Sequence, residues 1–222
     1  MNDITALKLT AFVAAAEWLS SIFSAPPSPQ RVAQGAARQE QDALRWMGEL
    51  LNAPAVVEAL CATLTQDAPE SLAVHLQRRY TMLFESIFRH RAVLPYESAW
   101  QDPGASSTLV ARPASEMSAV LRLLDVRISA DCPEPPDHLA IELAALATAL
   151  HDGQSAVAID LLSRLENWVP KFASALTQQD SGGFYAAAGE LLLALIDEAS
   201  VVLKRAETVA VSIIEERSGA SV

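Results

Sequence analysis

Residues Glu134–Glu142 gather most of the side chains in this chain that could do chemistry. Asp137 and His138 are adjacent, and Glu142 follows His138 by four residues, which is the spacing of one helix face. A carboxylate beside an imidazole can act as a general base, and the same two groups can begin a metal site. The chemistry to be weighed is therefore hydrolysis through His138, metal binding, or recognition of a charged partner.

Metal binding finds little support elsewhere in the sequence. A zinc site needs three or four ligands, and the other histidines, at positions 75, 90 and 151, form no cluster with Cys61 or Cys132. The sequence also lacks the phosphate-binding, dinucleotide-binding, nucleophile-elbow and zinc-protease motifs. We therefore expect no metal, no cofactor and no enzymatic activity, and a small hydrolase acting through His138 is the catalytic alternative.

A structural role competes with chemistry at Asp137 and His138. Pro135 and Pro136 suit the first turn of a helix, where N–H groups have no partner within the helix, and Asp137 adds a negative charge to that turn. His138 can then hydrogen-bond within the loop junction. Helix start and recognition site both remain open for this stretch.

A second cluster, Pro95–Trp100, places two aromatic residues and a carboxylate in a proline-bounded loop. Tyr96, Glu97 and Trp100 in such a loop are typical of a protein-recognition surface. Packing of the loop onto a helical body explains the same residues equally well.

The elements that must position these clusters are predicted to be helices. The chain is 51% hydrophobic and only 6% aromatic, Ala and Leu dominate, and β-branched residues form no alternating runs. We predict an all-α fold, a single globular domain over residues 1–222 with about ten helices. Apolar periodicity and proline or glycine stops predict helices over residues 5–23, 32–51, 54–64, 69–88, 114–124, 139–150, 155–168 and 184–214.

Two loops interrupt the middle of the chain. Residues 89–113 contain three prolines, a glycine and a Ser-Ser-Thr run, which predict a long ordered loop or a hinge that would permit domain swapping. Residues 125–136 are the second loop. Further along the chain, Pro170 is expected to break the helix predicted over residues 155–168. The Leu191–Ile196 run is apolar on nearly every side, so the last helix is expected to be the central buried one.

Charge and hydropathy restrict the partners. The net charge of −11 disfavours nucleic acid, which needs a basic face, and suits either a cationic partner or simple solubility. Residues 7–23 are apolar but are preceded by Asp3 and interrupted by Lys8 and Glu17, which indicates an amphipathic helix rather than a secretory signal or a membrane span. We expect a cytoplasmic protein without stable membrane association, either a monomer or a domain-swapped dimer.

Three blocks of sequence have a characteristic composition and order. They are Tyr80–Phe84 with Pro95–Trp100, then Glu134–Leu143, then Trp168–Phe172 with the aromatic pair at 184 and 185. In this order they resemble the TorD/DmsD/NarJ family of redox-enzyme maturation chaperones, and Glu134–Leu143 is similar to that family's most recognisable signature. The chain departs from the pattern at residues 85–91, where a glycine-rich turn is usual, and at residues 144–146, where an acidic residue is usual.

The resemblance implies an all-helical fold and a specific partner, the catalytic subunit of a molybdoenzyme in its apo form. It implies that the chain binds the twin-arginine leader or an equivalent N-terminal segment of that subunit. It further implies assistance with folding and with insertion of the molybdenum cofactor, before assembly or export. Guanine nucleotide binding, linked to some members, is not carried over, because this sequence has no phosphate cradle.

A leader with two guanidinium groups and an apolar stretch requires carboxylates next to an apolar surface. We hypothesise that the Pro95–Trp100 loop and the Glu134–Glu142 helix start form one concave site of this kind. Its predicted peptide-binding residues are Leu94, Tyr96, Glu97, Trp100, Glu134, Asp137, His138 and Glu142. The alternative from another class is a helical scaffold or assembly protein without a leader-binding groove.

Overall fold

The computed structural model describes residues 3–86, 92–100, 112–129 and 132–219, and the side chains of residues 4–208 within these ranges. The described residues contain nine α-helices and one 3-10 helix, which confirms the predicted all-α single domain. In chain order the elements are α1 (Asp3–Ser24), α2 (Pro29–Ala36), α3 (Arg38–Leu50), α4 (Pro54–Thr65), α5 (Pro69–Phe84), η1 (Glu97–Trp100), α7 (Arg112–Leu123), α8 (Leu139–His151), α9 (Ser155–Gln179) and α10 (Phe184–Gly219).

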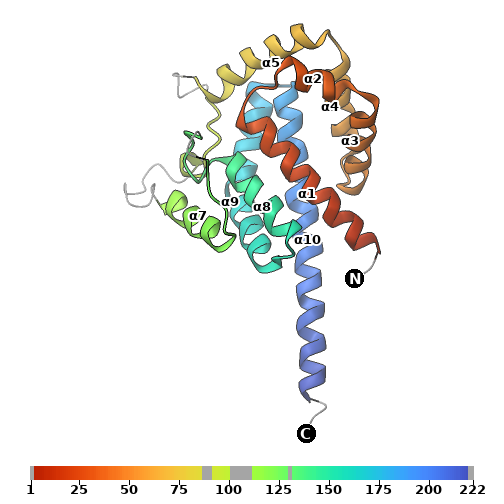
Figure 1. The fold of residues 1–222 in the computed structure, drawn as a ribbon, viewed down its shortest axis with the longest axis vertical. Helices are drawn as coiled ribbons and strands as arrows, with labels where there is room; N and C mark the ends of the chain where they lie inside the picture. The colour runs from red at the N-terminus through yellow and green to blue at the C-terminus, as the bar shows by residue number, and fades with distance from the viewer. Residues whose placement is uncertain (1–2, 87–91, 101–111, 130–131, 220–222) are drawn as a thin grey trace.

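Helix α10 passes through the middle of the molecule, between α1 on one side and α9 on the other, and its last turns project beyond the body (Figure 1). Leu191, Leu192 and Leu195 are fully buried, and Ile196 is nearly so. The prediction that the last helix is the central one is therefore confirmed.

Helix α1 is long and apolar enough to cross a membrane, by length and composition alone. In this structure its apolar face packs onto the domain instead, with Phe12, Leu19 and Phe23 completely buried. The hydroxyl of Ser20 donates a hydrogen bond to the carbonyl oxygen of Ala140 in α8 at 2.7 Å. Helix α1 therefore serves as a core helix of the domain.

The single helix predicted over residues 32–51 is wrong, because the structure has α2 and α3 there. Helix α2 begins at Pro29, whose missing N–H costs nothing in a first turn, and the side chain of Ser28 caps it. The backbone becomes extended at Ala37, which separates the two helices. Gln41 of α3 donates a side-chain hydrogen bond to the carbonyl oxygen of Gly35 at 2.7 Å, so the break leaves this carbonyl satisfied.

The expected break at Pro170 is also wrong, because α9 continues through it to Gln179. Proline in a helix interior removes one backbone hydrogen bond and costs about 3 kcal/mol. Trp168, Val169 and Phe172 are nearly or completely buried on either side of the proline, and their packing outweighs this cost. One continuous helix therefore presents Arg164, Trp168 and Phe172 at four-residue intervals.

An aromatic cluster connects α5 to the centre of the domain. Tyr80 and Phe84 are both 5% exposed, and each ring packs edge-on against Tyr185 of α10. Phe84 also stacks on Phe172 of α9, with ring centroids 6.4 Å apart. The Tyr80–Phe84 block of the sequence is therefore part of the core.

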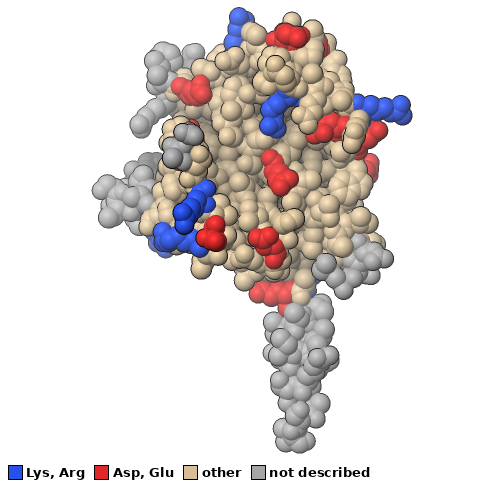
Figure 2. Space-filling view, viewed as in Figure 1, with Lys and Arg blue, Asp and Glu red and all other residues tan. Residues whose placement is uncertain are grey.

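The predicted hinge over residues 89–113 lies mostly outside the described residues, which include only 92–100 and 112–113 of it. Helix α5 ends at Phe84 rather than near residue 88, and α7 begins at Arg112 rather than at residue 114. On the face shown in Figure 2, basic side chains stand singly or beside acidic ones and form no continuous basic surface.

Candidate functional site

The two clusters of the sequence meet through their backbones, although about forty residues separate them along the chain. Tyr96 and His138 form an isolated antiparallel bridge. The amide of Glu97 donates to the carbonyl oxygen of Asp137 at 3.0 Å, and the amide of Leu139 donates to that of Pro95 at 2.8 Å. These bonds fix η1 against the start of α8.

The start of α8 differs from the expected one. The turn at Pro135, Pro136 and Asp137 precedes the helix, so the placement of these residues in its first turn is wrong. Asp137 directs its carboxylate to η1 instead, where Oδ2 accepts a hydrogen bond from the amide of Ser98 at 3.1 Å. His138 is the N-cap of α8, and its Nδ1 accepts from the amide of Ala140 at 3.1 Å.

His138 is closed to solvent and has a structural task. Its side chain is 2% exposed, and its ring packs edge-on against Tyr96 with centroids 5.0 Å apart. Burial lowers the pKa of His138 below its ordinary value, so the ring is neutral and Nδ1 can accept the capping bond. A general base must reach its substrate, and this imidazole is covered, so the geometry gives the hydrolase alternative no support.

A cluster of charges lies beneath the bridge, where η1, α8 and α9 meet. Arg164 of α9 is at its centre, with Nη2 2.6 Å from Glu97 Oε2 and Nε 3.4 Å from Glu142 Oε1. Its guanidinium also pairs with Glu116 of α7 at 3.2 Å and donates to the carbonyl oxygen of Pro113 at 2.7 Å. We call Glu97, Asp137, Glu142 and Arg164 the charged junction.

Glu142 is the most deeply buried member of the charged junction, with no exposed surface. Burial and the neighbouring charge of Glu97 raise the pKa of Glu142 well above its ordinary value, although Arg164 opposes the shift. Burial also raises the pKa of Glu97. The indole N–H of Trp168 donates to Glu142 Oε2 at 3.2 Å, so both oxygens of this buried carboxyl have partners.

The sequence reasoning missed Arg164 and Trp168 as members of the site. The signal was a basic residue at the edge of an apolar stripe, four residues before a tryptophan, in a helix that buries Leu161, Leu165 and Trp168. A buried or half-buried arginine requires carboxylate partners. The missed residue is therefore the one that holds Glu97 and Glu142 together.

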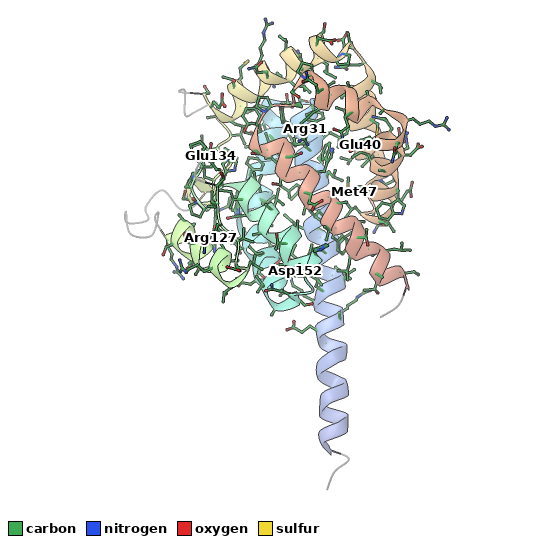
Figure 3. The ribbon with its side chains drawn as sticks, viewed as in Figure 1. Arg31, Glu40, Met47, Arg127, Glu134 and Asp152 are labelled. Carbon is green, nitrogen blue, oxygen red and sulfur yellow. The ribbon has the colours of Figure 1, made fainter. Side chains whose placement is uncertain are left out.

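Besides Glu97, whose side chain is 13% exposed, four of the predicted residues remain partly accessible: Leu94, Tyr96, Trp100 and Glu134. The hydroxyl of Tyr96 donates to Glu134 Oε2 at 2.7 Å, and burial together with this bond raises the pKa of Tyr96. The indole N–H of Trp100 donates to the carbonyl oxygen of Leu94 at 2.8 Å. We call these four residues the accessible edge; Figure 3 places Glu134 at the margin of the domain.

All eight predicted residues thus lie in one region, but they divide into two groups. Asp137, His138 and Glu142 are buried and Glu97 is 13% exposed in its side chain, and all four have partners within the chain. Within the described residues, no group of three or more His, Cys, Asp or Glu could hold a metal ion. The arrangement is suited to fixing a surface loop rather than to carrying out a reaction.

Comparison with known proteins identifies the family of this chain. The family profile described as "Nitrate reductase delta subunit" matches residues 51–174, which include both clusters. The chain is 32% identical to "Chaperone protein TorD" of Vibrio cholerae over 198 residues, covering 82% of this chain and 86% of that protein. It is 30% identical to the protein of the same name from Escherichia coli over 214 residues, covering 89% and 97% of the two chains.

A third relative of the same name, from Shewanella sp., is 28% identical over 192 residues, covering 85% of this chain and 91% of the relative. These proteins are named chaperones, and none is named as an enzyme. The chain belongs to the TorD/DmsD/NarJ family of redox-enzyme maturation chaperones.

Proposed function

We propose that this protein is a cytoplasmic chaperone that binds the twin-arginine leader, or an equivalent N-terminal segment, of one molybdoenzyme catalytic subunit. It holds the apo catalytic subunit while that subunit folds and receives its molybdenum cofactor, before assembly or export. The chaperone itself carries no cofactor and acts by binding alone.

The observation that carries the proposal is the bridge between Tyr96 and His138. It joins two of the three sequence blocks by which the chain resembles the family, with His138 buried and Tyr96 partly accessible. Residues of both blocks, Tyr96 and Glu134, are hydrogen-bonded to each other at the accessible edge. A functional surface that needs residues from both blocks explains why both blocks are present in the chain.

Leader binding is assigned to the accessible edge, and the buried residues position it. The Glu134 carboxylate can receive a guanidinium group, and the half-buried faces of Leu94, Tyr96 and Trp100 offer apolar and stacking surface beside it. Asp137 and His138 support this surface from below, through the bonds to η1 and to the first turn of α8. The net charge of −11 speeds the approach of a basic peptide.

The burial of Asp137 determines how the proposal should be tested. Charge reversal at Asp137 would leave a buried charge without a partner and unfold the junction, so a loss of binding would be uninformative. Glu134→Lys is the better variant, because this side chain is half-buried and has Tyr96 as its bonding partner. Tyr96→Phe is the matched control, since it removes the same hydrogen bond and keeps the carboxylate.

Isothermal titration calorimetry should use synthetic leader peptides of the molybdoenzyme catalytic subunits encoded in the same genome. We expect one peptide to bind the full-length protein, Glu134→Lys to weaken it by about tenfold or more, and Tyr96→Phe to retain most of the affinity. Equal affinity of wild type and Glu134→Lys would remove the accessible edge from the proposal. Absence of binding by every leader would favour a scaffold without a peptide site.

A further inference from the structure

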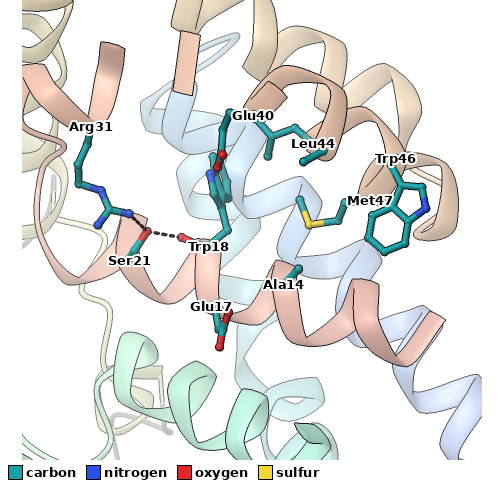
Figure 4. Close-up of a pocket in the computed structure, with 10 residues that line it drawn as sticks. Ala14, Glu17, Trp18, Ser21, Arg31, Glu40, Leu44, Trp46 and Met47 are labelled. Carbon is teal, nitrogen blue, oxygen red and sulfur yellow. Dashed lines mark hydrogen bonds between the residues drawn. The ribbon is translucent and has the colours of Figure 1, made fainter. Parts of the chain in front are cut away.

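A pocket of about 320 Å³ lies on another part of the surface, where α1, α2 and α3 meet (Figure 4). We call it the α1–α3 groove. It is lined by Ala14, Glu17, Trp18, Ser21, Arg31, Glu40, Ala43, Leu44, Trp46 and Met47. None of these residues belongs to the family blocks or to the charged junction, and Figure 3 shows Arg31, Glu40 and Met47 well away from Glu134.

Small side chains from two helices are among the residues that line the groove. Ala14 of α1 and Ala43 of α3 leave space that larger residues would fill. Leu44 and Met47, each 3% exposed, form an apolar floor. The thioether of Met47 suits such a floor, because methionine adapts to apolar groups of different shape.

Large apolar side chains stand beside this space without being covered. Trp46 is 40% exposed and extends at one end of the groove (Figure 4). Leu7 is 50% exposed and precedes Ala14 by seven residues, so the same face of α1 continues the apolar surface toward the N-terminus. Exposed tryptophan beside an apolar pocket is typical of a protein-binding surface.

The charges at the groove favour a cationic occupant. Within the described part of the chain, neither Glu17 nor Glu40 forms an ion pair, whereas Glu58, Glu116 and Glu166 all do. In Figure 4, Glu40 extends from α3 toward α1, whereas Glu17 points from α1 to the side away from Leu44 and Met47. The lining contains two carboxylates and one cation, and Glu40 is the carboxylate directed into the groove.

That cation, Arg31, is held at the opposite end from Trp46. Its Nη2 donates to the hydroxyl oxygen of Ser21 at 2.8 Å, and Ser21 in turn donates to the carbonyl oxygen of Trp18 (Figure 4). A cation that enters the groove meets the free carboxylate of Glu40 and the indole rings of Trp18 and Trp46, which attract positive charge.

We infer that the α1–α3 groove is a second docking site of this protein, and that it takes a peptide segment of a protein partner in which arginine or lysine stands among large apolar residues. The apolar residues cover Trp46, Met47 and the face of α1, while the basic residue pairs with Glu40. This site is separate from the accessible edge, so it extends the proposed function and does not depend on it.

The probe is a short amidated peptide of alanine, leucine and two arginines, labelled with fluorescein, and its partner is the same peptide with citrulline in place of arginine. Citrulline keeps the shape of arginine and removes its charge. The protein is full-length and carries Glu134→Lys, so that the accessible edge no longer favours a basic peptide. Fluorescence anisotropy should then show the arginine peptide binding about tenfold tighter than the citrulline peptide, with the difference shrinking as salt is added.

Three protein variants locate the binding. Glu40→Lys should weaken the arginine peptide by about tenfold and leave the citrulline peptide unchanged, and Trp46→Ala should weaken both peptides. Leu123→Ala is the matched control, because Leu123 of α7 is 72% exposed and lies outside the groove, and it should change neither affinity. Circular dichroism should confirm that each variant is folded.

Several outcomes would overturn the inference. They are equal binding of the two peptides, no binding of either peptide, or equal affinities for Trp46→Ala and Leu123→Ala. Sedimentation that shows a dimer of the wild type, abolished by Trp46→Ala, would assign the groove to a second copy of this chain instead. Loss of leader binding in Glu134→Lys with retained probe binding would separate this site from the proposed function.

Discussion

The charged junction and the α1–α3 groove use the same kinds of residue in opposite ways. At the junction, the carboxyl groups of Glu97 and Glu142 lie against Arg164, largely away from solvent, and these side chains are paired with one another within the chain. At the groove, Glu40 has no ion pair within the described residues, and Trp46 is 40% exposed. A carboxylate in a recognisable sequence block can thus be structural, while one in an ordinary helix is available to a partner.

The physical reason for the difference is the cost of burying charge. A buried carboxylate must be paired or protonated, so the packing of η1, α8 and α9 requires Arg164 at that position. A partly accessible carboxylate such as Glu40 still contacts water and has no such requirement. Substitutions should therefore change folding stability at the junction and partner binding at the groove.

The largest expected effect is that of Arg164→Ala. It would leave Glu97 and Glu142 without their cation in a buried site, so we expect a loss of about 3 kcal/mol in the free energy of unfolding. Urea denaturation measures this loss. Arg31→Ala is the matched change at the groove, where the arginine is exposed, and it should alter stability by no more than about 0.5 kcal/mol. Similar losses in both variants would break the comparison.

A smaller effect is expected at Asp137. Asp137→Ala removes the acceptor for the amide of Ser98, which then lies part-buried without its partner, and we expect a loss of about 1–2 kcal/mol. Glu40→Ala at the groove should stay within about 0.5 kcal/mol of wild type. Thermal unfolding of the two variants in parallel compares their losses of unfolding free energy. An equal or larger loss for Glu40→Ala than for Asp137→Ala would contradict the assigned roles.

The pH dependence of stability should show the raised pKa of Glu142. Because that pKa is raised, the folded protein holds a proton where the unfolded chain has lost it. The stability from this proton is complete below the ordinary value of 4.5 and is lost as the pH rises toward the folded-state value. Glu142→Gln should therefore lose less unfolding free energy than wild type as the pH rises above 4.5.

Glu166→Gln is the control with the opposite sign. The hydroxyl of Ser200 and the ammonium of Lys204 lower the pKa of Glu166, so its contribution is present above the ordinary value and is lost as the pH falls. Because the side chain of Glu166 is 36% exposed, its effect is small. Parallel pH profiles for wild type and Glu142→Gln would show that Glu142 does not hold the proton.

The sequence predicted most helices, because amphipathic periodicity and proline starts are local signals. It failed where tertiary contacts decide, at Pro170, whose neighbours are buried on both sides, and at Ala37, where the break is supported by Gln41. The structure brings together the two blocks in which the sequence clusters polar and aromatic residues, and their role in binding stays a prediction. Its division into buried and accessible residues depends on Arg164, which no local pattern linked to Glu97 or Glu142.

The α1–α3 groove had no sequence signal at all. Its lining comes from three helices, and the spacing of Ala14 and Ala43 becomes meaningful only when the two helices lie together. Trp46 is in the same helix as the buried Leu44 and Met47, and periodicity does not reveal that it stays uncovered. A groove between helices is a property of packing and cannot be read from periodicity.

The most direct test of the central claim is co-purification from bacterial cells. The tagged full-length protein would be co-expressed with each molybdoenzyme catalytic subunit of the same genome, either intact or lacking its N-terminal leader. The proposed function predicts that one intact apo subunit co-purifies and that its leaderless form is strongly reduced. Equal recovery of both forms, or recovery of no catalytic subunit, would contradict it.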